Sequence, residues 1–263
     1  MSDSSPPVAM PVAPDSVHVW RGFRAPGKDY EEFASFLGSV FVPACALLQP
    51  NANLRAYIPS MPSQKDKPSS VPDQTALMFW ATQQAYSDAF KTVAVRAYTN
   101  LHGGGYGPGS SAQFPIPLGQ QITPEQPFHL FDTPSDWMIG TVRHLVGARP
   151  ATQSVQDFLD MIQAWALEYR RDKPDGIDAA LLCAGQDYVV FWEHWSAGQS
   201  LSQSPLDDLS RQVTPYLNKV AEPVAPGGGL WDDWPGFDLT RYDCINIQLQ
   251  RPTSPARSTE SVS

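Results

Sequence analysis

The 263-residue chain has no run of about 20 apolar residues, the length that a helix needs to cross a membrane. Its first residues also lack the basic start and apolar stretch of a secretory signal. Cysteine is scarce: there are three, far apart and odd in number, which does not fit a disulfide framework. We therefore expect a cytoplasmic protein whose reduced, buried thiols are Cys45, Cys183 and Cys244.

Positive charge is in short supply. The chain has 18 Lys and Arg against 27 Asp and Glu, which gives a formal net charge of −9. Proteins that bind nucleic acid hold its phosphates with clustered Lys and Arg. This charge balance therefore excludes nucleic acid as the expected partner.

Motifs for common cofactors and metals are missing as well. There is no glycine-rich turn of the dinucleotide-binding kind, so we expect neither flavin nor nicotinamide. The histidines and cysteines show no metal-site spacing, so no metal is expected. A single haem ligand would leave no pattern, and haem stays as the less favoured alternative to having no cofactor. The histidines are His18, His102, His129, His144 and His194.

Strand and helix patterns follow in the same order in both halves of the chain. The first half predicts a strand at 17–23, a helix at 29–41, strands at 54–58 and 75–80, a helix at 86–101 and a strand at 128–131. The second half predicts a strand at 137–145, a helix at 154–170, strands at 177–183 and 188–195, a helix at 206–220 and a strand at 244–249.

The order βαββαβ is that of a ferredoxin-like unit, and its repetition predicts an α+β fold of two tandem units. The units would span 16–133 and 134–250, between polar tails at 1–15 and 251–263 that we expect to be disordered. Two echoes favour a duplication: Phe79-Trp80 and Phe191-Trp192 share a place in the third element, and a glycine triplet follows each second helix. Helices cover only one face of such a sheet, so the two bare faces should pack together as an intramolecular barrel.

The order of elements, the duplication and the aromatic third strand resemble the dimeric α/β-barrel superfamily. The Phe-Trp pair, followed by a polar segment and a helix, is similar to the antibiotic-biosynthesis monooxygenase type of that superfamily. The resemblance covers about residues 17–250 and implies a cavity between sheet and helices. It also implies cofactor-free oxygenation of an electron-rich aromatic substrate that itself activates oxygen. Because the superfamily includes haem proteins, haem is kept as a rival.

The string from Leu101 to Gly109 offers candidates for acid-base chemistry. Its His-Gly-Gly-Gly part could be the oxyanion loop of a hydrolase, but the chain has no G-x-S-x-G nucleophile motif. A helix stop followed by a turn is the simpler alternative. In the intermediate interpretation, His102 and Tyr106 form a proton-transfer pair at the mouth of the cavity.

Aromatic and basic side chains of the strands supply the candidate binding site. Alternation along the first strand places His18, Trp20 and Arg24 on one face. Trp80 and Trp192 would sandwich a planar substrate, and Trp231 would belong to a lid. The catalytic candidates are His102, Tyr106 and Arg24, and the substrate-binding candidates are His18, Trp20, Trp80, Trp192 and Trp231.

These features predict an enzyme of secondary metabolism, a cofactor-independent monooxygenase of an aromatic or polyketide-like small molecule. His102 would remove a proton from the substrate, and Arg24 would hold the resulting anion. Two alternatives stay open: a cyclase or isomerase that uses no oxygen, and a non-catalytic ligand- or haem-binding protein. The first unit is favoured as the site because it carries the His-Gly string. No membrane partner is expected, and two fused halves neither require nor forbid a homodimer.

Overall fold

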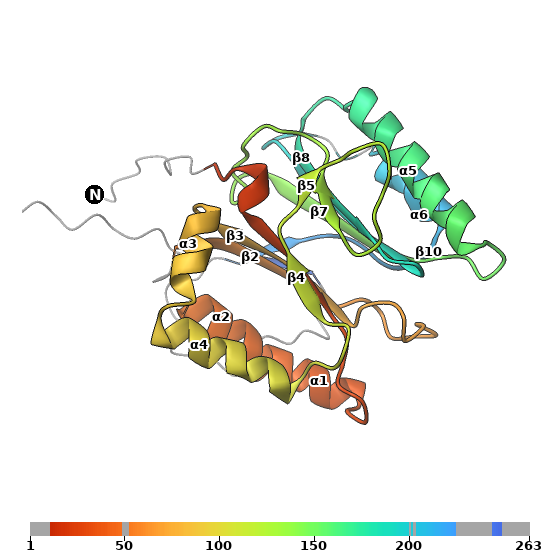
Figure 1. Ribbon diagram of the computed structural model, residues 1–263. Coiled ribbons are helices and arrows are strands. Elements are labelled where there is room, and N and C mark those ends of the chain that lie inside the picture. The colour runs from red at the N-terminus through yellow and green to blue at the C-terminus, as the bar shows by residue number, and fades with distance from the viewer. Residues whose placement is uncertain (1–10, 49–52, 200, 202–203, 225–243, 249–263) are drawn as a thin grey trace, which may run out of the picture.

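The computed structural model describes residues 11–48, 53–199, 201, 204–224 and 244–248. The chain has a mixed α+β fold with two six-stranded sheets, and helices lie on the outer face of each sheet (Figure 1). The inner faces of the sheets meet in a common apolar core. Helices, sheet, sheet and helices therefore follow one another through the molecule.

The first sheet is built mostly from the N-terminal half. Its strands are β1 (Val17–Gly22), β2 (Leu54–Ser60), β3 (Gln74–Trp80), β4 (Ser111–Gln113), β11 (Glu222–Val224) and β12 (Ile245–Gln248). They lie in the order β11-β12-β2-β3-β1-β4. β1 is antiparallel to both of its neighbours, β3 and β4. The site described below lies over these three strands.

The helices over this sheet begin where capping side chains satisfy free backbone N–H groups. Asp29 accepts a hydrogen bond from the N–H of Glu32 at 2.7 Å and starts α1 (Tyr30–Phe36), which continues through a π-helical turn, η2 (Leu37–Phe41), into α2 (Val42–Leu48). Thr82 caps α3 (Gln83–Ala89), and Thr92 caps α4 (Val93–Asn100). The helix expected at 86–101 is therefore two helices with a corner between them. Short 3-10 turns, η1 (Pro14–Ser16) and η4 (Leu101–Gly104), precede β1 and follow α4.

The second sheet is built mostly from the C-terminal half. Its strands are β5 (Ile116–Pro117), β6 (Pro127–His129), β7 (Thr141–Ala148), β8 (Ile177–Ala184), β9 (Tyr188–Trp195) and β10 (Thr214–Val220), in the order β10-β7-β9-β8-β6-β5. The long helix α5 (Val155–Arg171), capped by Ser154, and the short helix α6 (Leu206–Gln212) pack on its outer face. Each sheet contains four adjacent strands in the same arrangement, β4-β1-β3-β2 in one and β10-β7-β9-β8 in the other.

The two inner faces meet through apolar side chains and one buried polar contact. Val19 and Leu77 of the first sheet belong to the same core as Val190 of the second. Within this core, Thr75 Oγ1 and His144 Nε2 lie 2.8 Å apart, and His144 Nδ1 lies 2.8 Å from the carbonyl oxygen of Phe191. A buried hydrogen bond therefore joins the sheets directly.

Each sheet receives strands from the other half of the chain. β6 pairs with β8 in the second sheet, and β12 pairs with β2 in the first. The prediction from the sequence was wrong on this point, because it assigned the strand expected at 128–131 to the first unit. β4, only three residues long, occupies the place beside β1 instead. Pairing between distant segments cannot be read from the local pattern of either strand.

The prediction of a helix over 206–220 is also wrong for the second half of that range. α6 ends at Gln212, and residues 214–220 form β10, which pairs with β7. Pro215 explains the boundary, because a proline disfavours helical backbone at the residue before it and has no N–H for a helical hydrogen bond. As a result, the strand expected at 244–249 is not the last strand of the second sheet.

The two Phe-Trp pairs do not occupy equivalent positions. Trp80 is the last residue of β3 and packs toward the helices, whereas Trp192 lies three residues before the end of β9 and packs between the sheets. Side chains alternate along a strand, so an odd offset places them on opposite faces. The residue that ends β9 and faces its helices is Trp195.

Two other expectations concern the chain as a whole. Cys45, Cys183 and Cys244 are free and buried, as expected. Within the described residues, no helix combines the length and apolar character that crossing a membrane requires.

Candidate active site

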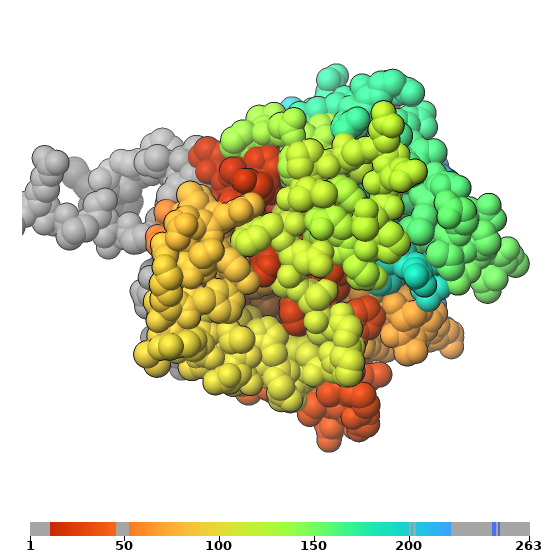
Figure 2. Space-filling view, in the orientation of Figure 1, coloured from red at the N-terminus to blue at the C-terminus, as the bar shows by residue number. Residues whose placement is uncertain are grey.

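A cavity of about 350 Å³ lies between the first sheet and helices α3 and α4. Figure 2 shows this face hollowed between the yellow atoms of α3 and α4 and the yellow-green atoms around β4. The strand residues that line it are His18, Trp20, Met78, Trp80, Ser111 and Ala112. From the helical side come Tyr86, Phe90, Val95, Tyr98, Thr99 and His102. The lining is mainly aromatic and includes no Lys, Arg, Asp or Glu.

Strand alternation brings the key side chains to the same face. His18 and Trp20 are two residues apart on β1, and Met78, which lies opposite His18, is two residues before Trp80 on β3. Their shared face is the one that the helices cover. The sequence-based placement of His18, Trp20 and Trp80 beside one cavity agrees with this geometry.

His18 is the titratable group best placed to act in the cavity. The residue is 6% exposed, and its ring contacts those of Tyr86 and Phe114, at centroid distances of 4.4 and 4.7 Å, while these two rings also contact each other at 5.0 Å. Burial lowers the pKa of His18 to about 4, although a hydrogen bond to the backbone of Ala112 opposes this. The imidazole is therefore neutral at neutral pH and able to accept a proton.

Three buried polar atoms of residues that line the cavity have no hydrogen-bond partner in the described structure. They are Nδ1 of His18 and the indole Nε1 atoms of Trp20 and Trp80. Buried polar atoms in proteins are nearly always paired, with protein, water or ligand. The residues around the cavity thus include one unpaired imidazole nitrogen, in His18, and two unpaired indole N–H groups, in Trp20 and Trp80.

His102 and Tyr106 are neighbours but do not form a proton-transfer pair. The half-buried His102 lines the cavity, its Nδ1 lies 2.8 Å from the carbonyl oxygen of Thr99, and burial lowers its pKa. Tyr106 stands behind Trp20 and donates its hydroxyl to Gln74 Oε1 at 3.0 Å. Burial raises the pKa of Tyr106 well above its usual value, so the phenol stays protonated.

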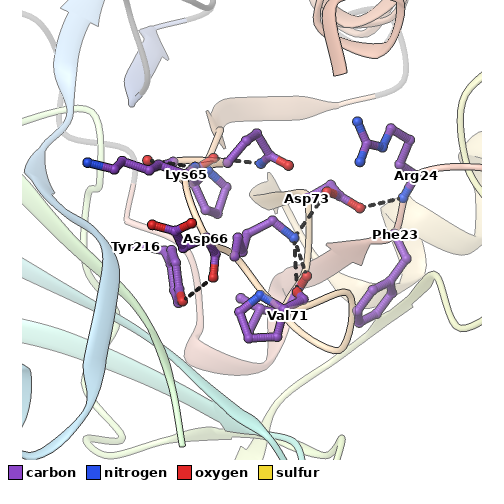
Figure 3. Close-up of polar contacts among 12 residues, drawn as sticks. Phe23, Arg24, Lys65, Asp66, Val71, Asp73 and Tyr216 are labelled. Atoms are coloured by element: carbon purple, nitrogen blue, oxygen red, sulfur yellow. Dashed lines mark hydrogen bonds and ion pairs between the residues drawn. The ribbon is translucent and has the colours of Figure 1, made fainter. Parts of the chain in front are cut away.

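Three other predicted site residues do not lie in this cavity. Arg24 lines a separate pocket near Lys67 and Asp73 (Figure 3). Trp192 is buried between the sheets, where its ring stacks on His144 at a centroid distance of 4.2 Å. It therefore cannot sandwich a ligand against Trp80. Trp231 lies outside the described residues.

Large side chains fill the corresponding space in the second half. Trp80 is the last residue of β3, and Trp195 is the last residue of β9. When the two strands are aligned at these ends, Ala76 of β3 corresponds to Phe191 of β9. Phe191 packs edge-on against Trp165 and Tyr169 of α5, with centroids 4.9 and 5.2 Å apart. This explains why the apolar cavity between sheet and helices lies in the first half, the half that the sequence favours.

The sequence did not identify two aromatic neighbours of His18. Tyr86 belongs to α3, where it was taken as part of a helix without a site role, and Phe114 follows β4 in a stretch expected to be a loop. Both rings pack on the His18 imidazole and on each other, as a cluster of three rings. Of these two residues, only Tyr86 could have been identified from the sequence, since it is an aromatic residue at the start of a helix that follows Trp80.

The side chains of the described residues do not form a site suited to a metal ion or a haem. No group of three or more His, Cys, Asp or Glu in the described part of the chain is arranged to hold a metal ion. A haem fits the cavity poorly, because its lining has no Lys or Arg to receive the propionates. We derive no chemistry through either group.

Comparison with known proteins gives only distant likenesses. No protein-family model matches the chain, and no curated protein matches its sequence. Among solved structures, one described as a "putative monooxygenase" from Lactobacillus acidophilus NCFM has a TM-score of 0.34 and 7% identity, covering 78% of this chain and 90% of its own. Another described in the same words, from Fusobacterium nucleatum subsp. nucleatum, has a TM-score of 0.32 and 11% identity, with 81% and 91% covered. An anthrone oxidase-like protein has a TM-score of 0.33 and 11% identity, with 80% and 92% covered. At TM-scores this low, the likenesses carry no weight for the function.

Proposed function

We propose that the protein is a cofactor-independent monooxygenase of an aromatic or polyketide-like small molecule in secondary metabolism. The observation that carries the proposal is His18, a neutral, buried imidazole with a free Nδ1, in a cavity whose other walls are mainly aromatic and apolar. Pockets of a few hundred cubic ångströms with few polar groups are typical of small-molecule sites. An unpaired imidazole nitrogen and unpaired indole N–H groups suit a planar substrate with an acidic hydroxyl or enol.

In the proposed reaction, the roles of the residues differ from the sequence-based ones. His18 Nδ1 takes a proton from the substrate, and the Trp80 indole N–H donates to the oxygen that becomes negative. Trp20 and Tyr86 supply aromatic walls for the ring system. Arg24 takes no part, since it lines another pocket.

The substrate anion and molecular oxygen supply everything else that the reaction needs. The anion passes an electron to oxygen, and the two radicals combine through a new C–O bond to give a peroxide anion, which takes the proton back from His18 and becomes a hydroperoxide. The peroxide O–O bond then breaks with loss of water, which leaves a carbonyl group where a CH₂ group stood. One oxygen atom enters the product and the other leaves as water, so no external reductant is required.

We also propose that the two halves arose by duplication of a single ferredoxin-like unit. In support of this, each half has four adjacent strands in the same order, and each sheet accepts strands from the other half. The second copy would then have lost its cavity through large residues such as Phe191.

The test follows the oxygen atoms. With a panel of polycyclic phenols and isotopically labelled O₂, the purified colourless protein should consume oxygen in proportion to product and place one labelled atom in it. Product formation in the absence of oxygen would instead establish the cyclase or isomerase. A Soret band in the purified protein, or binding with no conversion of any compound, would contradict the proposal.

A further inference from the structure

A second pocket, of about 310 Å³, lies just beyond the end of β1. Its walls come from the segment that follows β1 and from the loop between β2 and β3. Three basic residues line it, Arg24, Lys28 and Lys67, together with one acid, Asp73. Neither the proposed reaction nor the cavity around His18 uses any of these side chains.

Asp73 is fully engaged by its neighbours. Its Oδ2 accepts a hydrogen bond from the backbone N–H of Arg24 at 2.8 Å, and its Oδ1 lies 3.1 Å from Lys67 Nζ (Figure 3). The Lys67 ammonium also donates to the carbonyl oxygen of Val71 at 2.7 Å, and its side chain is 3% exposed. Asp73 and Lys67 therefore form a closed pair that fixes the loop.

The Arg24 guanidinium remains without a partner in the described structure. In Figure 3 only the backbone N–H of Arg24 is joined to the Asp73 carboxylate. The ammonium of Lys28 likewise has no ion pair or hydrogen bond within the described residues. Burial lowers the pKa of Lys67, and the nearby positive charge of Arg24 lowers it further. Like charges are thus held close together by the fold.

This concentration of positive charge is unusual for the chain. The whole protein has a formal net charge of −9, yet this pocket has three cations and one carboxylate on its walls. Once Lys67 and Asp73 offset each other, two unpaired cations remain, beside the polar side chains of Gln64 and Ser69. Such an arrangement attracts anions locally in spite of the overall charge.

We propose that this pocket binds the oxyanion group of a small molecule, a phosphate monoester or a carboxylate. The planar guanidinium of Arg24 matches two oxygens of such a group at once, and Lys28 adds a mobile point charge. Lys67 is held by Asp73 and Val71, so the two charges available to the anion are those of Arg24 and Lys28. The site is separate from the cavity around His18 and does not depend on the reaction proposed there.

Titration with inorganic phosphate and with acetate, each at constant ionic strength, tests the proposal. Binding is followed by calorimetry and by the NMR signal of the Arg24 Nε–H. We expect saturable binding of at least one anion, with an affinity at least tenfold weaker in Arg24→Gln and also weakened in Lys28→Gln. Lys91→Gln, which removes an exposed cation of a surface pair far along the chain, is the control and should bind as the wild type does.

The outcomes separate clearly. Preference for phosphate identifies a phosphate ester as the ligand class, and equal or better binding of acetate identifies a carboxylate. The absence of saturable binding overturns the proposal, and so does an equal affinity in Arg24→Gln and the wild type. Arg24→Gln keeps the backbone N–H that holds Asp73, and a thermal melt of each variant shows whether the fold is intact.

Discussion

Two ionisable side chains are buried on opposite faces of β1, within three residues of each other. His18 faces the cavity, and Arg21, which is 0% exposed, faces the other sheet. The Arg21 guanidinium donates to Ser111 Oγ at 2.7 Å, and its Nε lies 3.3 Å from Glu125 Oε2. Tyr188 donates to the same carboxylate oxygen at 2.5 Å. Glu125 is thus the counter-ion of a fully buried cation.

Removing that counter-ion should destabilise the fold. We expect Glu125→Ala to lower the free energy of unfolding by about 2 kcal/mol, less than for a fully buried pair because the Glu125 side chain is 47% exposed. Urea denaturation measures the change. The double variant Arg21→Met/Glu125→Ala should recover part of the loss, since it leaves no buried charge.

Glu168→Ala is the matched control for this prediction. Glu168 lies 3.7 Å from Arg171, and both side chains are about 70% exposed, so their pairing contributes little. We expect a change of at most about 0.5 kcal/mol. If Glu125→Ala proves as mild as Glu168→Ala, Glu125 is not the stabilising partner of Arg21.

At the scale of elements, the sequence predicted most strands and helices but not which strands would meet. Hydrophobic alternation located β1, β2, β3, β7, β8 and β9, and it placed His18 and Trp20 on one face. It could not locate β4, whose three residues Ser-Ala-Gln have no apolar pattern, nor assign β6 and β12 to their sheets. Those pairings depend on distant segments rather than on local propensity.

The sequence predicted only part of the candidate site, because a local pattern does not show which distant segments meet. The periodicity of a single strand was enough for His18, Trp20 and Trp80, whereas Arg24 follows the end of β1, where alternation no longer sets direction. Trp192 was misplaced because a two-residue echo does not fix the register of a strand. Only the observed pairing shows that Trp195, and not Trp192, ends β9 on the helical side.

The contact between β7 and β3 gives a testable dependence of stability on pH. His144 is fully buried between the sheets, and burial lowers its pKa to about 3. In the unfolded chain an ordinary histidine has a pKa of about 6.5, so below that pH the unfolded state takes up a proton that the folded state does not. The free energy of unfolding should therefore fall as the pH is lowered from about 6.5 toward 3.

His144→Gln removes this titrating group while keeping a side chain that can hydrogen-bond to Thr75. Between about pH 7 and pH 4.5, the wild type should lose roughly 2 kcal/mol more stability than the variant. Urea denaturation at the two pH values measures the difference. His18 titrates in both proteins and does not affect the comparison. Equal losses would show that His144 is not held neutral between the sheets.

At the scale of the whole molecule, the two halves depend on each other. They share the core between the sheets, and each contributes strands to the other's sheet, β6 and β12 among them. The cavity around His18 lies between sheet and helices of the first half, where Ala76 stands in place of a residue as large as Phe191. One half thus carries the proposed reaction, and the other supports it.

The central claim is that this cavity is an oxygenase site with His18 as its base, and oxygen uptake tests it most directly. The wild type, His18→Gln and His102→Gln are compared on the same polycyclic phenols, after thermal melts have confirmed their folds. We predict that His18→Gln lowers kcat by at least about 100-fold, and that His102→Gln changes it only a few-fold.

Because the pKa of His18 is about 4, kcat/KM of the wild type should not fall as His18 titrates until the pH approaches that value. Full activity in His18→Gln, or loss of activity in His102→Gln alone, would contradict the account.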